Sequence, residues 1–351
     1  MPNPPPPAVL EASRAAAGPV PLAGGQGTSF RAGSIVLKPA EFPYDEAAAL
    51  LFERLEVSGF RVPRPVRSAD ARLVVDGWTA SEFIDGEHAG PNGGRWPETI
   101  AACKAFHAAL ENVPLAPWNN LLAARSDAWA EADRLTFDER SVEPLPPFRE
   151  AIMRLTRFLR PVDSPSQLIH GDFTANVLFA EGKPPGVIDF SPYWRPGPFA
   201  LGVVVADAIA WADADESILE HCADVPEFPQ WLARGALRRV WELDQHSRRG
   251  RGYTPVEISA YEPAITRAAR NRPPTTHSHA MVDPASILRV NLRHLEQMYA
   301  TTRTEVGTTP GSRSRCARPG RPECLQAGPL RRGCPRRPVL LGQRRYGRPR
   351  D

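Results

Sequence analysis

The hydrophobic pattern of this chain changes between residues 85 and 97, and that change limits its possible folds more than any other feature. Before it, strand-like runs recur at 20–23, 28–32, 34–38, 62–67, 72–75 and 78–83, with helical spacing at 8–17 and 45–55. After it, helical spacing dominates at 98–111, 120–135, 148–159, 199–212, 231–246 and 287–299, interrupted by apolar strands at 168–170, 177–179 and 186–190. The sequence therefore predicts an α+β fold with two lobes, the first small and strand-rich, the second larger and helical.

This pattern divides the chain into four predicted segments. A proline-rich start and a short helix cover residues 1–17, and the strand-rich lobe covers 18–85. The helical lobe covers 86–300, and a tail covers 301–351. The junction between two lobes is a common place for a ligand cleft, so we expect functional residues from both lobes to meet there.

The net positive charge of the chain comes from the tail alone. The whole chain has 43 basic and 40 acidic residues, but arginine is concentrated after residue 300, so the preceding residues are net acidic. Rich in arginine, proline and glycine and without apolar periodicity, the tail is predicted to be disordered. It could bind RNA or DNA phosphates, or it could be out-of-frame translation of a GC-rich gene; we favour the second interpretation and expect no other nucleic-acid contact.

Membrane and secretory classes are excluded by the distribution of apolar residues. The longest uncharged apolar stretch, at 196–206, is far shorter than the ~20 residues that a spanning helix needs. The N-terminus lacks the basic and apolar regions of a signal peptide, and the cysteines number only five. We therefore predict a cytoplasmic protein.

Two features of the strand-rich lobe suit a bound phosphate. Gly24, Gly25 and Gly27 form a turn between two predicted strands, where backbone N–H groups can approach phosphate oxygens, although such a turn is also common in ordinary hairpins. Lys38 ends a strand and is one of only three lysines in an arginine-rich chain, which favours a specific role over a solvated surface position. Glu46, in the next helix, is its predicted partner, with Glu53 as the second choice.

The strongest motif lies in the helical lobe, at residues 168–179. An apolar strand leads to His170 and Asp172, and Asn176 begins a second apolar strand. Asp172 can orient an acceptor hydroxyl and take its proton, whereas His170 is expected to brace the loop through hydrogen bonds. Asn176 offers a neutral oxygen to a hard cation, and Asp189, at the end of the hairpin partner strand, can share that cation.

Together these residues resemble the aminoglycoside phosphotransferase and choline kinase-like family, a branch of the protein-kinase-like fold. The resemblance covers about residues 18–250. It implies Asp172 as the catalytic base, Asn176 and Asp189 as Mg²⁺ ligands, and Lys38 with Glu46 on the phosphates of ATP.

The same resemblance extends to two further segments. Residues 78–87 are similar to the family's hinge between the lobes, which implies that the backbone of Glu82, Phe83 and Ile84 holds the adenine. Residues 105–108 are similar to a scaffold helix of the family, so His107 is interpreted as structural.

Two departures from the family pattern are visible. Only Phe173, Thr174 and Ala175 separate Asp172 from Asn176, one residue fewer than usual, which shifts the asparagine by up to ~3.5 Å of chain. The residues after Asp189 lack the usual glycine, which indicates a branch separate from the antibiotic-resistance members. Either the loop closes differently around its shorter length, or transfer is impaired.

The residues and the resemblance lead to one principal function and two alternatives. We predict a Mg²⁺- and ATP-dependent phosphotransferase that moves the γ-phosphate to a hydroxyl of a small molecule. The first alternative is a nucleotide-binding regulatory module without transfer activity, a pseudokinase, because of the shortened loop. The second is a nucleic-acid-binding protein that uses the basic tail.

Other candidate residues have a structural explanation as well as a functional one. His277 and His279 could ligate a metal, but no third ligand is near them in the sequence. Trp194 and Arg195 could shape the acceptor pocket or simply pack. A group of acidic residues could line a pocket for a cation, although a solvated helix face is the favoured interpretation: Asp207, Asp213, Asp215, Glu216 and Glu220.

Overall fold

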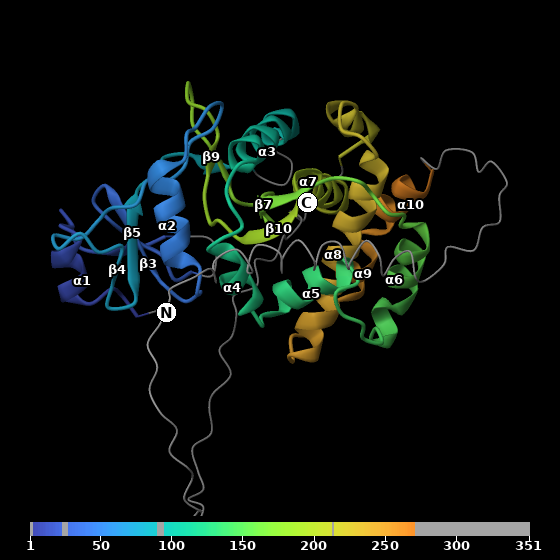
Figure 1. Cartoon of the computed structure of the whole chain (residues 1–351), viewed down its shortest axis with the longest axis horizontal. Coiled ribbons are helices and arrows are strands. Elements are labelled where there is room, and N and C mark those ends of the chain that lie inside the picture. The colour runs from blue at the N-terminus through green and yellow to red at the C-terminus, as the bar shows by residue number, and fades with distance from the viewer. Residues whose placement is uncertain (1–2, 23–26, 90–94, 213, 271–351) are drawn as a thin grey trace, which may run out of the picture. The chain divides into compact units, whose positions relative to one another are not determined.

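The computed structural model describes residues 3–22, 27–89, 95–212 and 214–270 (Figure 1). Gly24 and Gly25 of the glycine turn, Asp213, the histidines at 277 and 279, the helix expected at 287–299 and the tail lie outside these ranges. No helix in the described part of the chain is long and apolar enough to cross a membrane.

The N-terminal lobe is built on a five-stranded antiparallel sheet with the order β1-β2-β3-β5-β4. The strands are β1 (Val20–Pro21), β2 (Phe30–Ala32), β3 (Ile35–Pro39), β4 (Val74–Val75) and β5 (Trp78–Glu82). Helix α1 (Pro7–Ala12) contributes Val9 to a hydrophobic cluster that also contains Leu37 and Ala80 of the sheet. Helix α2 (Asp45–Arg54) instead directs Phe52 into the larger core of the helical lobe. The two helices thus belong to different hydrophobic clusters.

The second lobe is mainly helical. Its helices are α3 (Trp96–Leu110), α4 (Trp118–Ala123), α5 (Ala128–Thr136), α6 (Pro146–Phe158), α7 (Gly197–Trp211), the 3-10 helix η1 (Glu216–Cys222), α8 (Phe228–Arg248), α9 (Pro255–Ser259) and α10 (Glu262–Arg270). Together with the antiparallel N-terminal sheet, they confirm the predicted α+β class.

Short strands in this lobe carry the predicted motif. β7 (Ser166–His170) pairs with β10 (Pro192–Pro196), and β8 (Val177–Phe179) lies between β6 (Glu87–His88) and β9 (Gly186–Val187). The β8–β9 pair is the predicted hairpin, with Asn176 immediately before it and Asp189 just after it. The first strand of the motif pairs with β10, which the sequence analysis did not anticipate.

Two expected elements are wrong. The run at 62–67 makes one isolated bridge, Pro65 with Ser81, because its prolines cannot donate to a ladder. The helix expected at 120–135 is two helices, since the Asp127 side chain accepts the N–H of Ala130 and starts α5.

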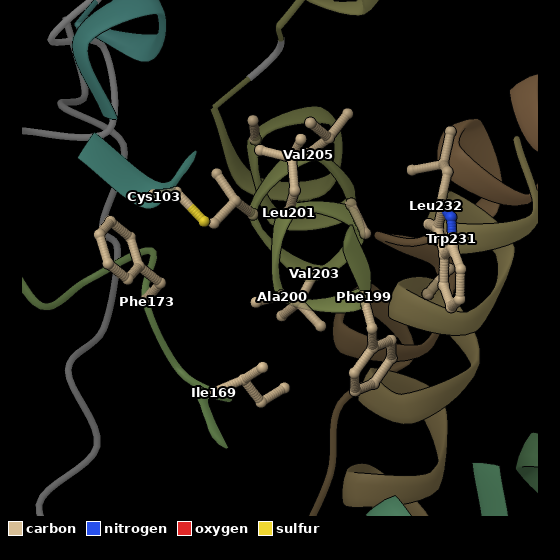
Figure 2. Close-up of a cluster of buried hydrophobic side chains, with 14 of the residues drawn as sticks. Cys103, Ile169, Phe173, Phe199, Ala200, Leu201, Val203, Val205, Trp231 and Leu232 are labelled. Atoms are coloured by element: carbon tan, nitrogen blue, oxygen red, sulfur yellow. The ribbon is translucent and has the colours of Figure 1, made fainter. Parts of the chain in front are cut away.

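Helix α7 lies at the centre of the second lobe and is apolar on almost every side (Figure 2). Phe199, Leu201 and Val205 are each at most 3% exposed and belong to the same cluster as Ile169, Phe173 and Trp231. The contact with α8 is unusually close: a Cβ at Gly202 would collide with the carbonyl group of Trp231, and one at Gly235 with the backbone of Gly202. Glycine at these two positions therefore permits the helices to touch.

This close approach predicts the effect of Gly202→Ala. An alanine in a helix normally stabilises it, but here its methyl group meets a backbone carbonyl that cannot rotate away. We expect the free energy of unfolding to fall by about 1–3 kcal/mol, the range for overpacked cores, in denaturant titrations followed by tryptophan fluorescence. Gly18→Ala is the control, because a Cβ there meets nothing within 4 Å. An unchanged stability of the Gly202 variant would contradict the close packing.

Candidate active site between the lobes

An ion pair joins the two lobes at the predicted phosphate site. The Nζ atom of Lys38, on β3, lies 2.6 Å from Oδ1 of Asp189, which follows β9. The side chains are 42% and 33% exposed, so both remain accessible to a ligand. Asp189 has a φ of 52°, a left-handed conformation that non-glycine residues adopt rarely and that often marks a functional position.

Asp172 stands at the start of the loop between β7 and β8. Its Oδ1 accepts a 2.7 Å hydrogen bond from Nη2 of Arg239, and its side chain is 43% exposed. Partial removal of the carboxylate from water raises the pKa of Asp172. The charge and hydrogen bond of Arg239 act in the opposite direction and hold the pKa below its ordinary value. The carboxylate is therefore ionised at neutral pH, with one oxygen held by the protein.

The shortened loop closes on itself. Asn176 donates from Nδ2 to the carbonyl oxygen of Asp172 at 2.6 Å, and its backbone N–H donates to the carbonyl of Phe173 at 3.1 Å. The N–H of Ile188 donates to the carbonyl of Asn176, which ties the loop to the strand before Asp189. Three residues are therefore enough to bring the asparagine amide back to Asp172.

His170 makes hydrogen bonds to the backbone of both segments that carry the acidic residues. Its Nδ1 accepts the N–H groups of Asp172 (3.2 Å) and Ser191 (3.4 Å), and its Nε2 donates to the carbonyl of Ile188 (3.1 Å). The ring is fully buried, and burial lowers its pKa to about 4, so it is neutral. Both ring nitrogens serve the loops, which is the bracing role expected for this residue.

His107 supports the same strand. Its Nδ1 donates to the carbonyl of Cys103, and its Nε2 accepts the N–H of His170 at 3.1 Å. The side chain is 5% exposed, and burial lowers its pKa to about 4. These contacts agree with the structural role inferred from the sequence.

The partner expected for Lys38 requires correction. Lys38 pairs with Asp189, whereas Glu46 is exposed on α2. Glu53, the second choice, binds Arg67 through both carboxylate oxygens at 2.6 and 2.8 Å. The acidic residue of α2 that is influenced by Lys38 is Asp45: burial raises its pKa, while the N–H of Phe42 and the Lys38 charge act in the opposite direction.

The hinge presents fewer free groups than expected. The N–H of Glu82 donates to the carbonyl of Arg64, and that of Phe83 donates to the carbonyl of Ser34, both at 2.8 Å. Within the described ranges, the N–H of Ile84 has no such partner. Of the three residues predicted to hold adenine, Ile84 therefore offers the available backbone donor.

Several residues near Asp172 were missed or misread in the sequence. Arg239, on α8, binds Asp172, Asp207 and Glu242 together. Asp207 is 6% exposed, so the solvated-face interpretation is wrong for it, although Asp215, Glu216 and Glu220 are exposed as expected. Arg195 is buried against Asp133 and Glu139, which shows a packing role. No signal in the sequence distinguished Arg239 from its neighbours on a long, arginine-rich helix.

The available oxygen donors suit a hard cation. Asn176, whose amide nitrogen is turned to Asp172, leaves its Oδ1 as an acceptor, and Asp189 carries a second carboxylate oxygen beside the one that contacts Lys38. The described residues contain no cluster of three or more histidine, cysteine or acidic side chains arranged to hold a metal. One or two protein oxygens completed by phosphate oxygens are typical of Mg²⁺ sites, so these residues fit Mg²⁺.

Comparisons with known proteins give a family and several similar solved structures. A model described as the phosphotransferase enzyme family matches residues 31–249. Similar solved structures include an aminoglycoside phosphotransferase from Alicyclobacillus acidocaldarius, at 14% identity and a TM-score of 0.49, covering 86% of this chain and 98% of that one. The choline kinase LicA from Streptococcus pneumoniae is 11% identical, with a TM-score of 0.43 and coverages of 72% and 93%. No curated protein matches the sequence significantly.

The buried His107 predicts how stability depends on pH. The unfolded chain protonates this residue near pH 6.5, but the folded protein does so only near pH 4, so acid favours unfolding between these values. We expect His107→Gln to reduce the slope of unfolding free energy against pH by up to about 1.4 kcal/mol per pH unit in that window. Denaturant titrations from pH 4 to 7 measure the difference; identical slopes in both proteins would contradict the neutral buried ring.

Proposed function

The chain belongs to the phosphotransferase enzyme family, and from that premise we propose that it transfers the γ-phosphate of Mg²⁺-ATP to a hydroxyl of a small molecule in the cytoplasm. The observation that carries the proposal is the 2.6 Å contact between Lys38 and Asp189. These residues are 151 positions apart and come from different lobes, beside a loop that holds Asp172 and Asn176. An ammonium, two carboxylates and an amide at one lobe junction are the groups that phosphoryl transfer requires.

In this proposal, the N-terminal lobe binds the nucleotide. Lys38 exchanges part of its contact with Asp189 for phosphate oxygens, which its compact ammonium suits. The N–H of Ile84, which has no backbone partner among the described residues, donates to the adenine, and the backbone N–H of Gly27 donates to a phosphate. Gly27 has a φ of 72°, a conformation that side chains disfavour, which supports a need for glycine there.

Asp172 acts on the acceptor. The acceptor oxygen forms a bond to the γ-phosphorus while the bond from that phosphorus to the bridging oxygen of ADP breaks, and the hydroxyl proton passes to Asp172. Because Arg239 lowers the pKa of Asp172, the carboxylate is a weak base whose first task is to orient the hydroxyl. Its second oxygen is free for this purpose, since Arg239 binds only Oδ1.

Asn176 and Asp189 would hold Mg²⁺ through Oδ1 and a carboxylate oxygen. When bound, the cation neutralises charge on the phosphates of ATP. The protein's own contribution is to fix the two donors: Asn176 is oriented by its bond to Asp172, and Asp189 by the backbone bond from Ile188 to Asn176.

The alternative of a pseudokinase differs in one measurable way. Both proteins would bind ATP, but only an enzyme transfers the phosphate. Closure of the shortened loop by the Asn176–Asp172 hydrogen bond favours transfer over a degenerate site. A screen for labelled phosphate moving from ATP to pooled small alcohols separates the two functions.

Asp172→Ala is the decisive variant in that screen. We expect turnover to fall by about 10²–10⁴-fold, the usual contribution of a positioned base, with ATP affinity nearly unchanged because Lys38 and the hinge are intact. Turnover by phosphate transfer and affinity by calorimetric titration are the two measurements. Equal turnover in both proteins would remove Asp172 from the mechanism.

Asp189→Asn tests the cation site. Loss of the carboxylate charge should weaken ATP binding in the presence of Mg²⁺ by about tenfold or more, with a smaller effect in its absence. Asp163→Asn, at an exposed loop position, is the matched control. A thermal-shift titration with Mg²⁺ and ATP measures both; a Mg²⁺ response equal to that of the control would contradict the assignment.

A further inference from the structure

Asp207 and Arg239 form a buried arrangement that the proposed chemistry does not itself require. Asp207, on α7, is 6% exposed and accepts hydrogen bonds from Nε of Arg239 (3.0 Å), Nη2 of Arg239 (2.6 Å), the Thr174 hydroxyl (2.8 Å) and the Tyr261 hydroxyl (3.0 Å). A carboxylate taken out of water needs such compensation, and here it comes from three residues in different parts of the chain.

Two sets of hydrogen bonds connect this carboxylate to the loop between β7 and β8. In the first, Arg239 donates from the same Nη2 to Asp207 and, at 2.7 Å, to Asp172. In the second, the Thr174 hydroxyl donates directly to Asp207. Thr174 lies in the middle of the three residues that separate Asp172 from Asn176. The loop is therefore tied to α7 at its centre and, through Arg239, at Asp172.

The packing of α7 on α8 explains why these groups meet. The backbones touch at Gly202 and Gly235, where no side chain could fit. Asp207 lies about one and a half turns beyond Gly202, and Arg239 about one turn beyond Gly235. The close contact thus brings a carboxylate of one helix to the guanidinium of the other, directly behind the loop.

The neighbouring Arg238 strengthens the same attachment. It is fully buried, donates from Nη1 to the carbonyl oxygen of Gly171, and pairs with Glu242 at 2.9 Å. Arg239 also binds Glu242, at 2.8 Å. Both arginines therefore hold the first residues of the loop, one at the backbone of Gly171 and one at the side chain of Asp172.

We propose that Asp207 and Arg239 are positioning residues, which hold Asp172 and the shortened loop in the arrangement needed for transfer. This inference rests on the proposed function of Asp172. Small displacements of a reacting group can cost about 10²-fold in rate, so a loop with one residue fewer gains from a rigid attachment. Lys38 and the hinge lie in the other lobe and Asp189 lies outside the loop, so ATP affinity should change much less than turnover when this attachment is lost.

The test compares Arg239→Met, Arg239→Lys and Thr174→Val in the full chain, with transfer of labelled phosphate from Mg²⁺-ATP to the pooled small alcohols as the activity. For Arg239→Met we expect kcat to fall by about 10²-fold, with KM and the binding stoichiometry for ATP within about twofold of wild type. Lysine retains the charge but not the planar fork, so Arg239→Lys should recover to within about tenfold of wild type. Thr174→Val should lose roughly tenfold, as expected for a hydrogen bond to a charged group.

Arg248→Met is the control on the same helix. Arg248 pairs with the fully buried Asp244 at 2.6 Å, away from the loop, so its loss disturbs a comparable ion pair without touching Asp172. We expect its kcat to equal that of wild type. An Arg239→Met protein with unchanged kcat, or with kcat reduced no more than in the control, would overturn the proposal, as would equal changes in kcat and KM.

Hydrogen exchange separates failure of this inference from failure of the proposed function. Amides of residues 171–176 should exchange about tenfold faster in Arg239→Met and Thr174→Val, and not in Arg248→Met, whether or not ATP is consumed. If wild type transfers no phosphate from ATP to any of the pooled alcohols, the proposed function fails, and the exchange rates alone decide whether the loop is held as described. Unchanged exchange in both loop variants would overturn the attachment itself, and faster exchange with unchanged kcat would overturn its role in transfer.

Discussion

The close contact of α7 with α8 is the constraint on which the rest of the second lobe depends. Helix α7 is buried along nearly its whole length, so each face must find a partner: strands and the loop of the candidate site on one side, α8 on another. Glycine at 202 and 235 lets the backbones touch, and this contact leaves no room for water between the helices. The polar groups near it, Asp207 and Arg239, must therefore satisfy one another and the loop. The core and the site share one geometric cause.

The ion pair between Lys38 and Asp189, unlike the buried contact between Asp207 and Arg239, is partly exposed. Lys38 and Asp189 are both about one-third exposed or more, and pairs of this kind contribute about 0–1 kcal/mol to stability. Asp189 also adopts a left-handed backbone conformation, which costs free energy for a residue other than glycine. A weak contact combined with an unfavourable conformation is difficult to explain by folding alone. Both are understandable if the two groups are kept partly exposed so that phosphate oxygens can reach them.

The parts of this arrangement that could be predicted from sequence are those encoded within a few residues. The strands around Asp172 and Asn176 are short apolar runs next to polar residues, and the hairpin that leads to Asp189 follows from their spacing. Contacts that depend on the rotation of a whole helix could not be predicted. The preference of Lys38 for Asp189 over Glu46 and the burial of Asp207 depend on how α2 and α7 are turned. The N–H groups of Glu82 and Phe83 donate to carbonyls of segments far apart in sequence, so these hydrogen bonds could not be predicted either.

The shortened loop illustrates how local sequence and tertiary contacts divide the task. The deletion alone suggested an impaired site, because the chain between Asp172 and Asn176 is shorter by the length of one residue. In the structure Asn176 nevertheless contacts the Asp172 carbonyl, and the residues between them are held in place. Phe173 is buried in the core, and Thr174 donates a hydrogen bond to Asp207. A loop with so few free torsions loses little further entropy when it binds a substrate. The shorter connection is therefore compatible with transfer because the helices behind it supply the order that additional chain would otherwise have to provide.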